Sequence, residues 1–252
     1  MKKLMIAAAA SIAAVSAFAV VESPNIVGYQ NKEVRKLLSQ QIVTFDKIGV
    51  DGIDIQGLLP VDGDGAYVGG GEVTVQFIND RGKVTGGYAY YGKDEYDDGY
   101  AAGWYDEATD ELADYSFENG EAFMVLAGAA CNFTYNGEVN MLTTYIPCRK
   151  LLSVQGNIRP AAVDIQTIVP YDSTDEADQA YVGGGEVTVQ FTNDRGKVIG
   201  GYAYYGKDEY DDGYAAGWYD ESTDELAEYS FGAGEGFLML TGQACYLKFP
   251  AL

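Results

Sequence analysis

Two acidic loops carry the residue types that bind a hard cation. Residues 93–99 read KDEYDDG, and the same seven residues return at 207–213. Grouped carboxylates before a glycine are the donors that calcium prefers. The helix–loop–helix calcium motif is absent, because Tyr96 and Tyr105 stand at its third and twelfth positions when Asp94 is the first. The alternative interpretation is a solvated acidic loop that binds no ion. The candidate calcium ligands are Asp94, Glu95, Asp97, Asp98, Asp208, Glu209, Asp211 and Asp212.

Aromatic side chains flank both acidic loops. Tyrosine and tryptophan on strands stack on sugar rings or form protein contacts, but aromatic side chains also supply much of the area buried in a core. Tyr88 and Tyr90 share one face of their predicted strand, whereas Tyr91 points to the other. One face should therefore be core, and the other is either a contact surface for carbohydrate or protein or an amphipathic surface without a ligand. The candidate contact residues are Tyr88, Tyr90, Trp104, Tyr105, Tyr202, Tyr204, Trp218 and Tyr219.

Composition narrows the function classes. The 252-residue chain contains no histidine, which excludes Ser-His-Asp and Cys-His catalysis and the usual zinc sites. Its net charge of −22 repels nucleic acid and anionic lipid and attracts divalent cations and basic partners. No pair of carboxylates is singled out for glycoside hydrolysis. We therefore expect a protein that is not an enzyme and has no cofactor other than calcium.

The first 19 residues have the features of a bacterial-type secretory signal. Lys2 and Lys3 precede an apolar run that ends in Ala17-Phe18-Ala19. A charged start, a short apolar stretch and an A-x-A site predict cleavage after Ala19. The rest of the sequence has no second apolar run of membrane-spanning length. The mature protein is thus expected outside the cytoplasm, secreted or at the cell surface.

Three cysteines follow the leader, and export makes a disulfide feasible. Cys131 and Cys245 occupy equivalent positions of an internal repeat, so they are not expected to pair with each other. If the first and last strands of the second repeat are neighbours, the bridge joins Cys148 to Cys245 and leaves Cys131 free or intermolecular. The alternative is three buried, reduced thiols.

The repeat organises the whole chain. Residues 66–131 return at 180–245 without a gap, and 55 of the 66 positions are identical. Flanking segments repeat more loosely, with four residues deleted upstream and four inserted before Ala180. The sequence therefore predicts a signal peptide over residues 1–19 and two tandem domains over 20–144 and 145–252.

Alternating polar and apolar residues predict strands rather than helices. The clearest is a β-hairpin over 72–91, with a turn at 79–82 and a bulge near Gly86-Gly87. Other strands are expected at 25–29, 41–45, 104–106, 121–126 and 131–135, with a short return strand at 111–113. A short helical turn with Asp54 near its cap is expected over residues 54–59. The predicted fold is all-β, with two similar β-sandwich-like or partly closed barrel domains.

This order resembles that of certain uncharacterised secreted bacterial β modules. The resemblance rests on an early Asn25-Ile26-Val27-Gly28-Tyr29 strand and a late Gly-x-Gly-Phe strand, which reads Gly234-Glu235-Gly236-Phe237 in the second repeat. The first repeat departs from it at Ala122. The resemblance implies residence at the cell surface or outside the cell and no known catalysis.

These observations predict a secreted structural, adhesive or assembly protein that presents one tyrosine-rich acidic surface twice. Its partners would be further copies of itself or other cell-surface components, including glycans. The alternative is a carbohydrate-binding module in which the Trp/Tyr hairpin face is the platform.

Overall fold

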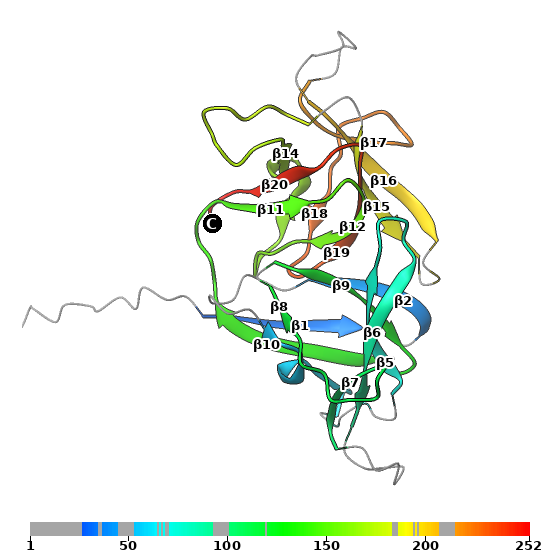
Figure 1. Cartoon of the computed structure of the whole chain (residues 1–252). Helices are drawn as coiled ribbons and strands as arrows, with labels where there is room; N and C mark the ends of the chain where they lie inside the picture. Colours follow the sequence, from blue (N-terminus) through cyan, green and yellow to red (C-terminus); the bar gives the residue numbers. More distant parts are fainter. Residues whose placement is uncertain are drawn as a thin grey trace, which may run out of the picture.

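The computed structural model describes residues 27–34, 37–44, 53–64, 66, 68, 71–92, 101–118, 120–182, 186–193, 195, 197–206 and 215–252. Over these residues the protein is all-β, and no sheet closes into a barrel. The sheets form two matching sets, one from each half of the chain (Figure 1). In the described part of the chain, no helix is long and apolar enough to cross a membrane.

A five-stranded sheet of the same order forms the larger layer of each half. In the N-terminal half the order is β2 (Leu37–Thr44), β9 (Ala122–Ala127), β5 (Val73–Ile78), β6 (Val84–Tyr91) and β7 (Gly103–Asp106). In the C-terminal half it is β12 (Leu151–Gly156), β19 (Gly236–Thr241), β15 (Val187–Thr192), β16 (Val198–Tyr205) and β17 (Gly217–Asp220). Neighbouring strands are antiparallel throughout.

Smaller elements complete each half. One three-stranded sheet has the order β1 (Val27–Val34), β10 (Cys131–Glu138) and β4 (Leu59–Val61), and the other has β11 (Thr144–Cys148), β20 (Cys245–Phe249) and β14 (Val169–Tyr171). Two-stranded sheets pair β3 (Ile53–Asp54) with β8 (Ser116–Phe117), and β13 (Val163–Asp164) with β18 (Ser230–Phe231). The 3-10 helices η1 (Ile55–Gly57) and η2 (Ile165–Thr167) lie between them.

Each half encloses its own hydrophobic core between the two larger sheets. In the N-terminal core, Val34 and Phe133 of the three-stranded sheet meet Val75, Trp104 and Phe123 of the five-stranded sheet. The C-terminal core repeats this arrangement. Alternation along each strand directs one set of side chains into this core. The architecture is therefore a layered sheet packing in each half.

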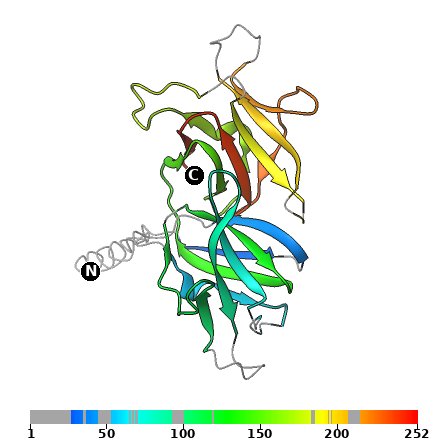
Figure 2. The same ribbon diagram turned by 45° about the vertical axis from the view of Figure 1, so that its right-hand side comes forward.

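The two halves pack through equivalent strands. β2 and β9 lie against β12 and β19, and the halves stand one above the other in Figure 2. Ile78, Met124 and Leu238 form a buried cluster at this contact, with Leu152 packed against it. Arg149 Nη2 also donates to the carbonyl oxygen of Ile78 at 2.7 Å. Apolar burial and this hydrogen bond together join the halves.

Most strand predictions are confirmed, but β2 begins at Leu37, β10 continues to Glu138, and other elements also differ. The predicted hairpin is β5 and β6, but its extra residue is Thr85, just before the glycine pair. β1 continues to Val34, beyond the predicted end. The predicted return strand forms only an isolated bridge between Leu112 and Tyr105. The turn at Asp54 is confirmed, because its side chain accepts a hydrogen bond from Gln56 N and caps η1.

Strand pairing locates part of the length difference between the halves. Leu37 and Leu151 pair with equivalent residues of β9 and β19, whereas the next paired residues are Gln40 and Leu152. The N-terminal half thus has two extra residues in a β-bulge of its edge strand β2. The predicted boundary between residues 144 and 145 falls at the start of β11.

Candidate functional site

Both tryptophans are core residues, which corrects their prediction as ligand contacts. Trp104 and Trp218 are 0% exposed. Their indole N–H groups donate to the carbonyl oxygens of Leu58 and Ile168, each at 2.6 Å. A buried indole needs such a partner. Neither ring is available as a platform for a sugar.

A glutamine beside each tryptophan explains this burial. The Gln56 side chain accepts from Trp104 N and donates to Trp104 O and Ala113 O. Gln166 makes the same three bonds around Trp218. The repeated Ile-Asp-Ile-Gln and Val-Asp-Ile-Gln segments therefore fix β7 and β17 onto the cores.

Three predicted contact tyrosines are also buried. Tyr90, Tyr204 and Tyr219 are 1%, 2% and 9% exposed, so their prediction as contacts is wrong. Tyr88, Tyr105 and Tyr202 are partly buried. Tyr88 and Tyr90 do share a face, as predicted, but that face is directed at the core. A strand's alternation shows which residues share a face and not which face the second sheet covers.

The partly buried tyrosines belong to an aromatic cluster that occurs twice. In the N-terminal half, the ring centroids of Phe77 and Tyr88 are 5.9 Å apart, those of Phe77 and Tyr115 5.2 Å, and those of Tyr88 and Tyr115 5.4 Å. The corresponding distances among Phe191, Tyr202 and Tyr229 are 5.6, 5.0 and 5.5 Å. We call each set a Phe–Tyr–Tyr cluster.

A carboxylate holds the second tyrosine of each cluster. Tyr115 OH donates to Glu121 Oε1 at 2.5 Å, and Tyr229 OH donates to Glu235. Burial and this hydrogen bond raise the pKa of Tyr115 and of Tyr229 well above 10. Burial and the nearby Asp220 likewise raise the pKa of Tyr202. The cluster phenols are therefore neutral hydrogen-bonding groups at physiological pH, not nucleophilic phenolates.

The glycine pair that occurs in both repeats makes room for a second carboxylate. A Cβ on Gly201 would lie 2.8 Å from Glu221 Oε2 and 2.3 Å from the carbonyl oxygen of Val189. Gly87 has the same relation to Glu107 and Val75. The preceding Gly86 and Gly200 face open space. The glycines thus let an acidic side chain lie close to the strand beside each aromatic cluster.

In the C-terminal half the cluster lines an open groove of about 610 Å³. Phe191, Tyr202 and Tyr229 form its aromatic wall, and Asp220 and Glu221 are its acidic residues. None of the described residues that line it is basic. Ile199, 65% exposed, adds an apolar edge. This combination of aromatic rings and carboxylates suits a cationic group.

The N-terminal cluster borders a different cavity. Phe77, Thr85 and Glu121 line a cleft of about 780 Å³ together with residues of the other half. Among these is Arg149, whose guanidinium reaches the carbonyl oxygen of Ile78. The two copies of the cluster therefore have different surroundings. The N-terminal copy borders a cleft toward the other half, and the C-terminal copy lines a solvent-open groove.

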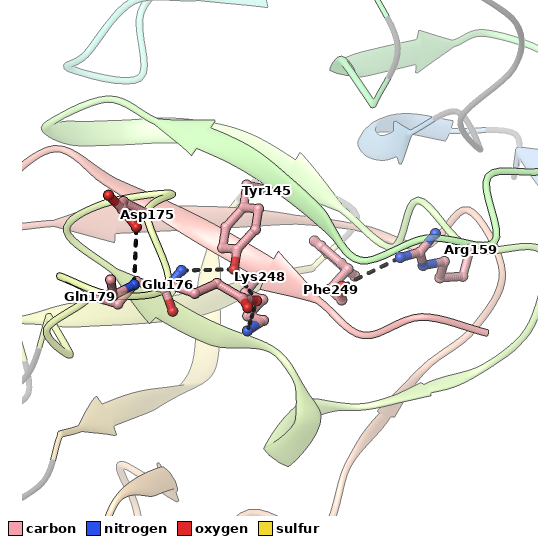
Figure 3. Close-up of polar contacts among 8 residues, drawn as sticks. Tyr145, Arg159, Asp175, Glu176, Gln179, Lys248 and Phe249 are labelled. Atoms are coloured by element: carbon pink, nitrogen blue, oxygen red, sulfur yellow. Dashed lines mark hydrogen bonds and ion pairs between the residues drawn. The ribbon is translucent and has the colours of Figure 1, made fainter.

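A polar network occurs on the small sheet of the C-terminal half (Figure 3). Glu176 Oε1 accepts from Lys248 Nζ at 2.9 Å and from Tyr145 OH at 3.1 Å, and Gln179 Nε2 donates to Tyr145 OH at 2.7 Å. Glu176 lies in the loop over residues 172–178, which contains the four-residue insertion. Lys248 Nζ is also 5.6 Å from the ring centroids of Tyr145 and Tyr171.

Arg159, also drawn in Figure 3, is a buried structural residue. Its guanidinium donates to the carbonyl oxygens of Asn140 and Leu142, which precede β11. It also donates to those of Phe249 and Pro250, near the end of the chain. These bonds tie the connection between the halves to the last strand. Because no ligand-facing group is involved, we assign Arg159 to stability.

The predicted calcium ligands Asp94, Glu95, Asp97, Asp98, Asp208, Glu209, Asp211 and Asp212 lie outside the described residues. Within the described part of the chain, no three His, Cys, Asp or Glu residues are grouped as a metal site. Asp106 caps its own turn by accepting from Ala108 N and Thr109 N. Calcium binding therefore stays a prediction from sequence.

Four residues of the Phe–Tyr–Tyr clusters were not among the candidates predicted from the sequence. Phe77, Tyr115, Phe191 and Tyr229 recur in both repeats, as does the Asp/Glu-Tyr-Ser-Phe segment that contains the second tyrosine. That recurrence was a usable signal. Arg159 lies outside the near-identical segment, and its spacing gave no indication of its role.

Comparison of the chain with protein-family models, curated proteins and solved structures found no match.

Proposed function

We propose that this is a secreted, non-enzymatic structural or adhesive protein that contacts its partner through the two Phe–Tyr–Tyr clusters. One observation carries the proposal: the same cluster, with the same carboxylate neighbours, is built twice with nearly equal ring spacings. In the C-terminal half, the partly buried rings of Phe191, Tyr202 and Tyr229 border an open groove, which supports a contact surface.

The groove chemistry favours lysine or arginine side chains of a protein partner. Asp220 and Glu221 supply charge complementarity, and the faces of Tyr202 and Tyr229 offer cation–π contacts. The net charge of −22 attracts such a partner over longer distances. A partner that engages both clusters gains from effective concentration, so two weak contacts give durable binding.

A peptide-binding experiment tests this proposal. The mature protein, beginning at Val20, is titrated with an arginine-rich peptide and with a glutamate-rich peptide of equal length. We expect binding of the basic peptide only, weakening as salt rises. Glu221→Gln should weaken it by about tenfold, corresponding to the loss of one charge-assisted contact. Glu228→Gln is the matched control, because Glu228 is exposed and outside the groove. Equal effects of the two variants would refute the groove as the contact site.

Glycan binding is the second candidate function. Because both tryptophans are buried, its candidate site is the groove of the C-terminal half. Thr192 and Ser222 add hydroxyls to the lining of the groove that Tyr202 and Tyr229 also line, and hydroxyls with aromatic rings suit a sugar. A neutral oligosaccharide series distinguishes this candidate. Saturable, salt-insensitive binding lost in Tyr202→Ala, with the fold retained, would favour glycans over a basic protein.

Assembly and calcium are tested together by sedimentation. The mature protein is sedimented with calcium and with chelator. Calcium-dependent growth in size supports the acidic loops as ligands in a structural role. A monomer at high protein concentration, unchanged by calcium and without any cell-surface binding, would refute the structural proposal.

A further inference from the structure

The first and last strands of the C-terminal half bring two cysteines face to face. Cys148 ends β11 and Cys245 begins β20, and the two are register partners in an antiparallel pair. Both thiols are buried and within hydrogen-bonding contact of each other. All three cysteines of the chain are free thiols in this structure. Chain folding alone therefore places two oxidisable thiols together.

The backbone geometry of this pair suits a covalent bridge. Directly opposite residues of antiparallel strands have Cα atoms about 4.5–5.5 Å apart. Disulfides span Cα separations of about 4.4–6.8 Å. The strand register therefore places the two cysteines within the Cα separation that a disulfide spans.

The N-terminal half provides an internal contrast. There Val34 stands opposite Cys131, at the positions equivalent to Cys148 and Cys245. Cys131 consequently has no cysteine across the strand pair. Burial also raises its pKa to about 12, which keeps the thiol protonated and unreactive.

We propose that Cys148 and Cys245 form a disulfide that fastens β11 to β20. The oxidant is a disulfide-containing molecule: a thiol–disulfide oxidoreductase outside the cytoplasm, or oxidised glutathione in vitro. One cysteine thiolate attacks the oxidant's disulfide and gives a mixed disulfide, releasing one oxidant thiol. The second cysteine thiolate then displaces the other oxidant thiol. The protein loses two protons and two electrons, and the oxidant gains them as its disulfide becomes two thiols.

The burial of both cysteines determines the stage of folding at which this bond can form. Neither thiol is open to a large oxidant once the strands have closed, because each cysteine is only 2% exposed. The reaction therefore belongs to folding, before β11 and β20 are fully packed. The resulting bridge closes a long loop, which constrains the unfolded chain.

The bridge also steadies the contact between the halves. Arg149, the neighbour of Cys148, donates to Ile78 O, and Leu152 N donates to Asp80 O at 3.2 Å. Arg149 directly follows Cys148, and Leu152 lies in the next strand, β12. Loss of the bridge should therefore loosen the contact as well as the C-terminal half.

Thiol counting tests the proposal independently of cellular location and of groove binding. The mature chain is refolded with oxidised and reduced glutathione, then denatured and titrated for thiols. We expect one free thiol, a mass lower by two hydrogens, and a non-reduced peptide map that links Cys148 to Cys245. Three free thiols, or a bridge that includes Cys131, would overturn the proposal.

Two variants add a stability readout. Cys148→Val installs the residue that the N-terminal half uses, and Cys131→Ala removes only the unpaired thiol. Reductant should lower the unfolding temperature of the wild type and of Cys131→Ala by at least about 10 °C. It should leave Cys148→Val unchanged. If Cys148→Val fails to fold, the wild-type thiol count still decides the matter.

Discussion

The two halves of this protein share sheet order, core and aromatic cluster, yet they differ in what secures them. The C-terminal half has the buried Arg159, the facing Cys148 and Cys245, and the Glu176 network. The N-terminal half has Val34 opposite Cys131 and a bulge in β2. The near-identical segments thus form the same strands in both halves. Residues outside these segments determine how stably the strands are held together. We expect the C-terminal half to be the more stable of the two.

Each half contains its own fluorescent reporter, because Trp104 and Trp218 are the only tryptophans of the chain. Trp218→Phe leaves a protein that reports on the N-terminal half alone, and Trp104→Phe leaves one that reports on the C-terminal half. Unfolding measured in these two single-tryptophan variants distinguishes the stability of one half from that of the other.

The largest effect is expected for Arg159→Met. Loss of the guanidinium leaves four carbonyl acceptors without their charged donor. The C-terminal half should lose at least about 3 kcal/mol in free energy of unfolding. Urea denaturation followed by Trp218 fluorescence measures this loss. A uniform, small loss at both reporters would contradict the assignment of Arg159 to the closure of one half.

Val34→Cys should allow the N-terminal half to form a disulfide equivalent to the one proposed for the C-terminal half. The new cysteine faces Cys131, as Cys148 faces Cys245. Oxidation should stabilise the N-terminal half by up to about 4 kcal/mol, because the closed loop is about 100 residues long. Trp104 fluorescence in urea, with and without reductant, provides the measurement. If the pair stays reduced in oxidant, the two strand pairs are not equivalent in geometry.

Exchanging the residues at one equivalent position tests the contact between the halves. Ile78 is buried against Met124 and Leu238, whereas its equivalent Thr192 is partly exposed. Ile78→Thr should lower stability by about 1–2 kcal/mol. Thr192→Ile should change it by less than about 0.5 kcal/mol. Chemical denaturation of both variants compares them, and equal losses would show that the contact is symmetric.

Alkaline pH should affect both halves alike. The folded-state pKa of Tyr115 and Tyr229 is raised above the unfolded value of about 10 by burial and by their glutamates. Their contribution is therefore complete below about pH 10 and is lost as pH rises toward the folded pKa. Tyr115→Phe and Tyr229→Phe should each reduce this decline at its own reporter. A decline unaffected by both variants would place its origin elsewhere.

The smallest effect is expected for Glu176→Gln. Lys248 lowers the pKa of Glu176, but the Glu176 side chain is 69% exposed, so solvent screens their attraction. The unfolding temperature should not change measurably in a thermal melt at neutral pH. A clear loss would mean that the inserted segment fastens the small sheet, and would widen the contrast between the halves.

Sequence patterns predicted much of the local structure. Alternation located the β5–β6 hairpin, and the Asp54 cap was confirmed by its bond to Gln56 N. The expected proximity of Cys148 and Cys245 follows from the pairing of the first and last strands of the second repeat, and their register confirms it. These features depend on backbone conformation and chain order, which short segments specify.

The candidate site needed the tertiary structure. Trp104 and Tyr90 were expected at a surface, but the three-stranded sheet covers their face and Gln56 holds the tryptophan inward. Phe77, Tyr88 and Tyr115 meet from β5, β6 and the segment before β8, so no single stretch of sequence displays the cluster.

The sequence by itself therefore determined the duplication, the strands, the turns and the absence of histidine chemistry. Only the tertiary structure decided which face of each strand is buried, where the carboxylates meet the tyrosine rings, and that Arg159 closes one half. The physical reason is that strand periodicity is local, whereas burial depends on which distant sheet packs against each face.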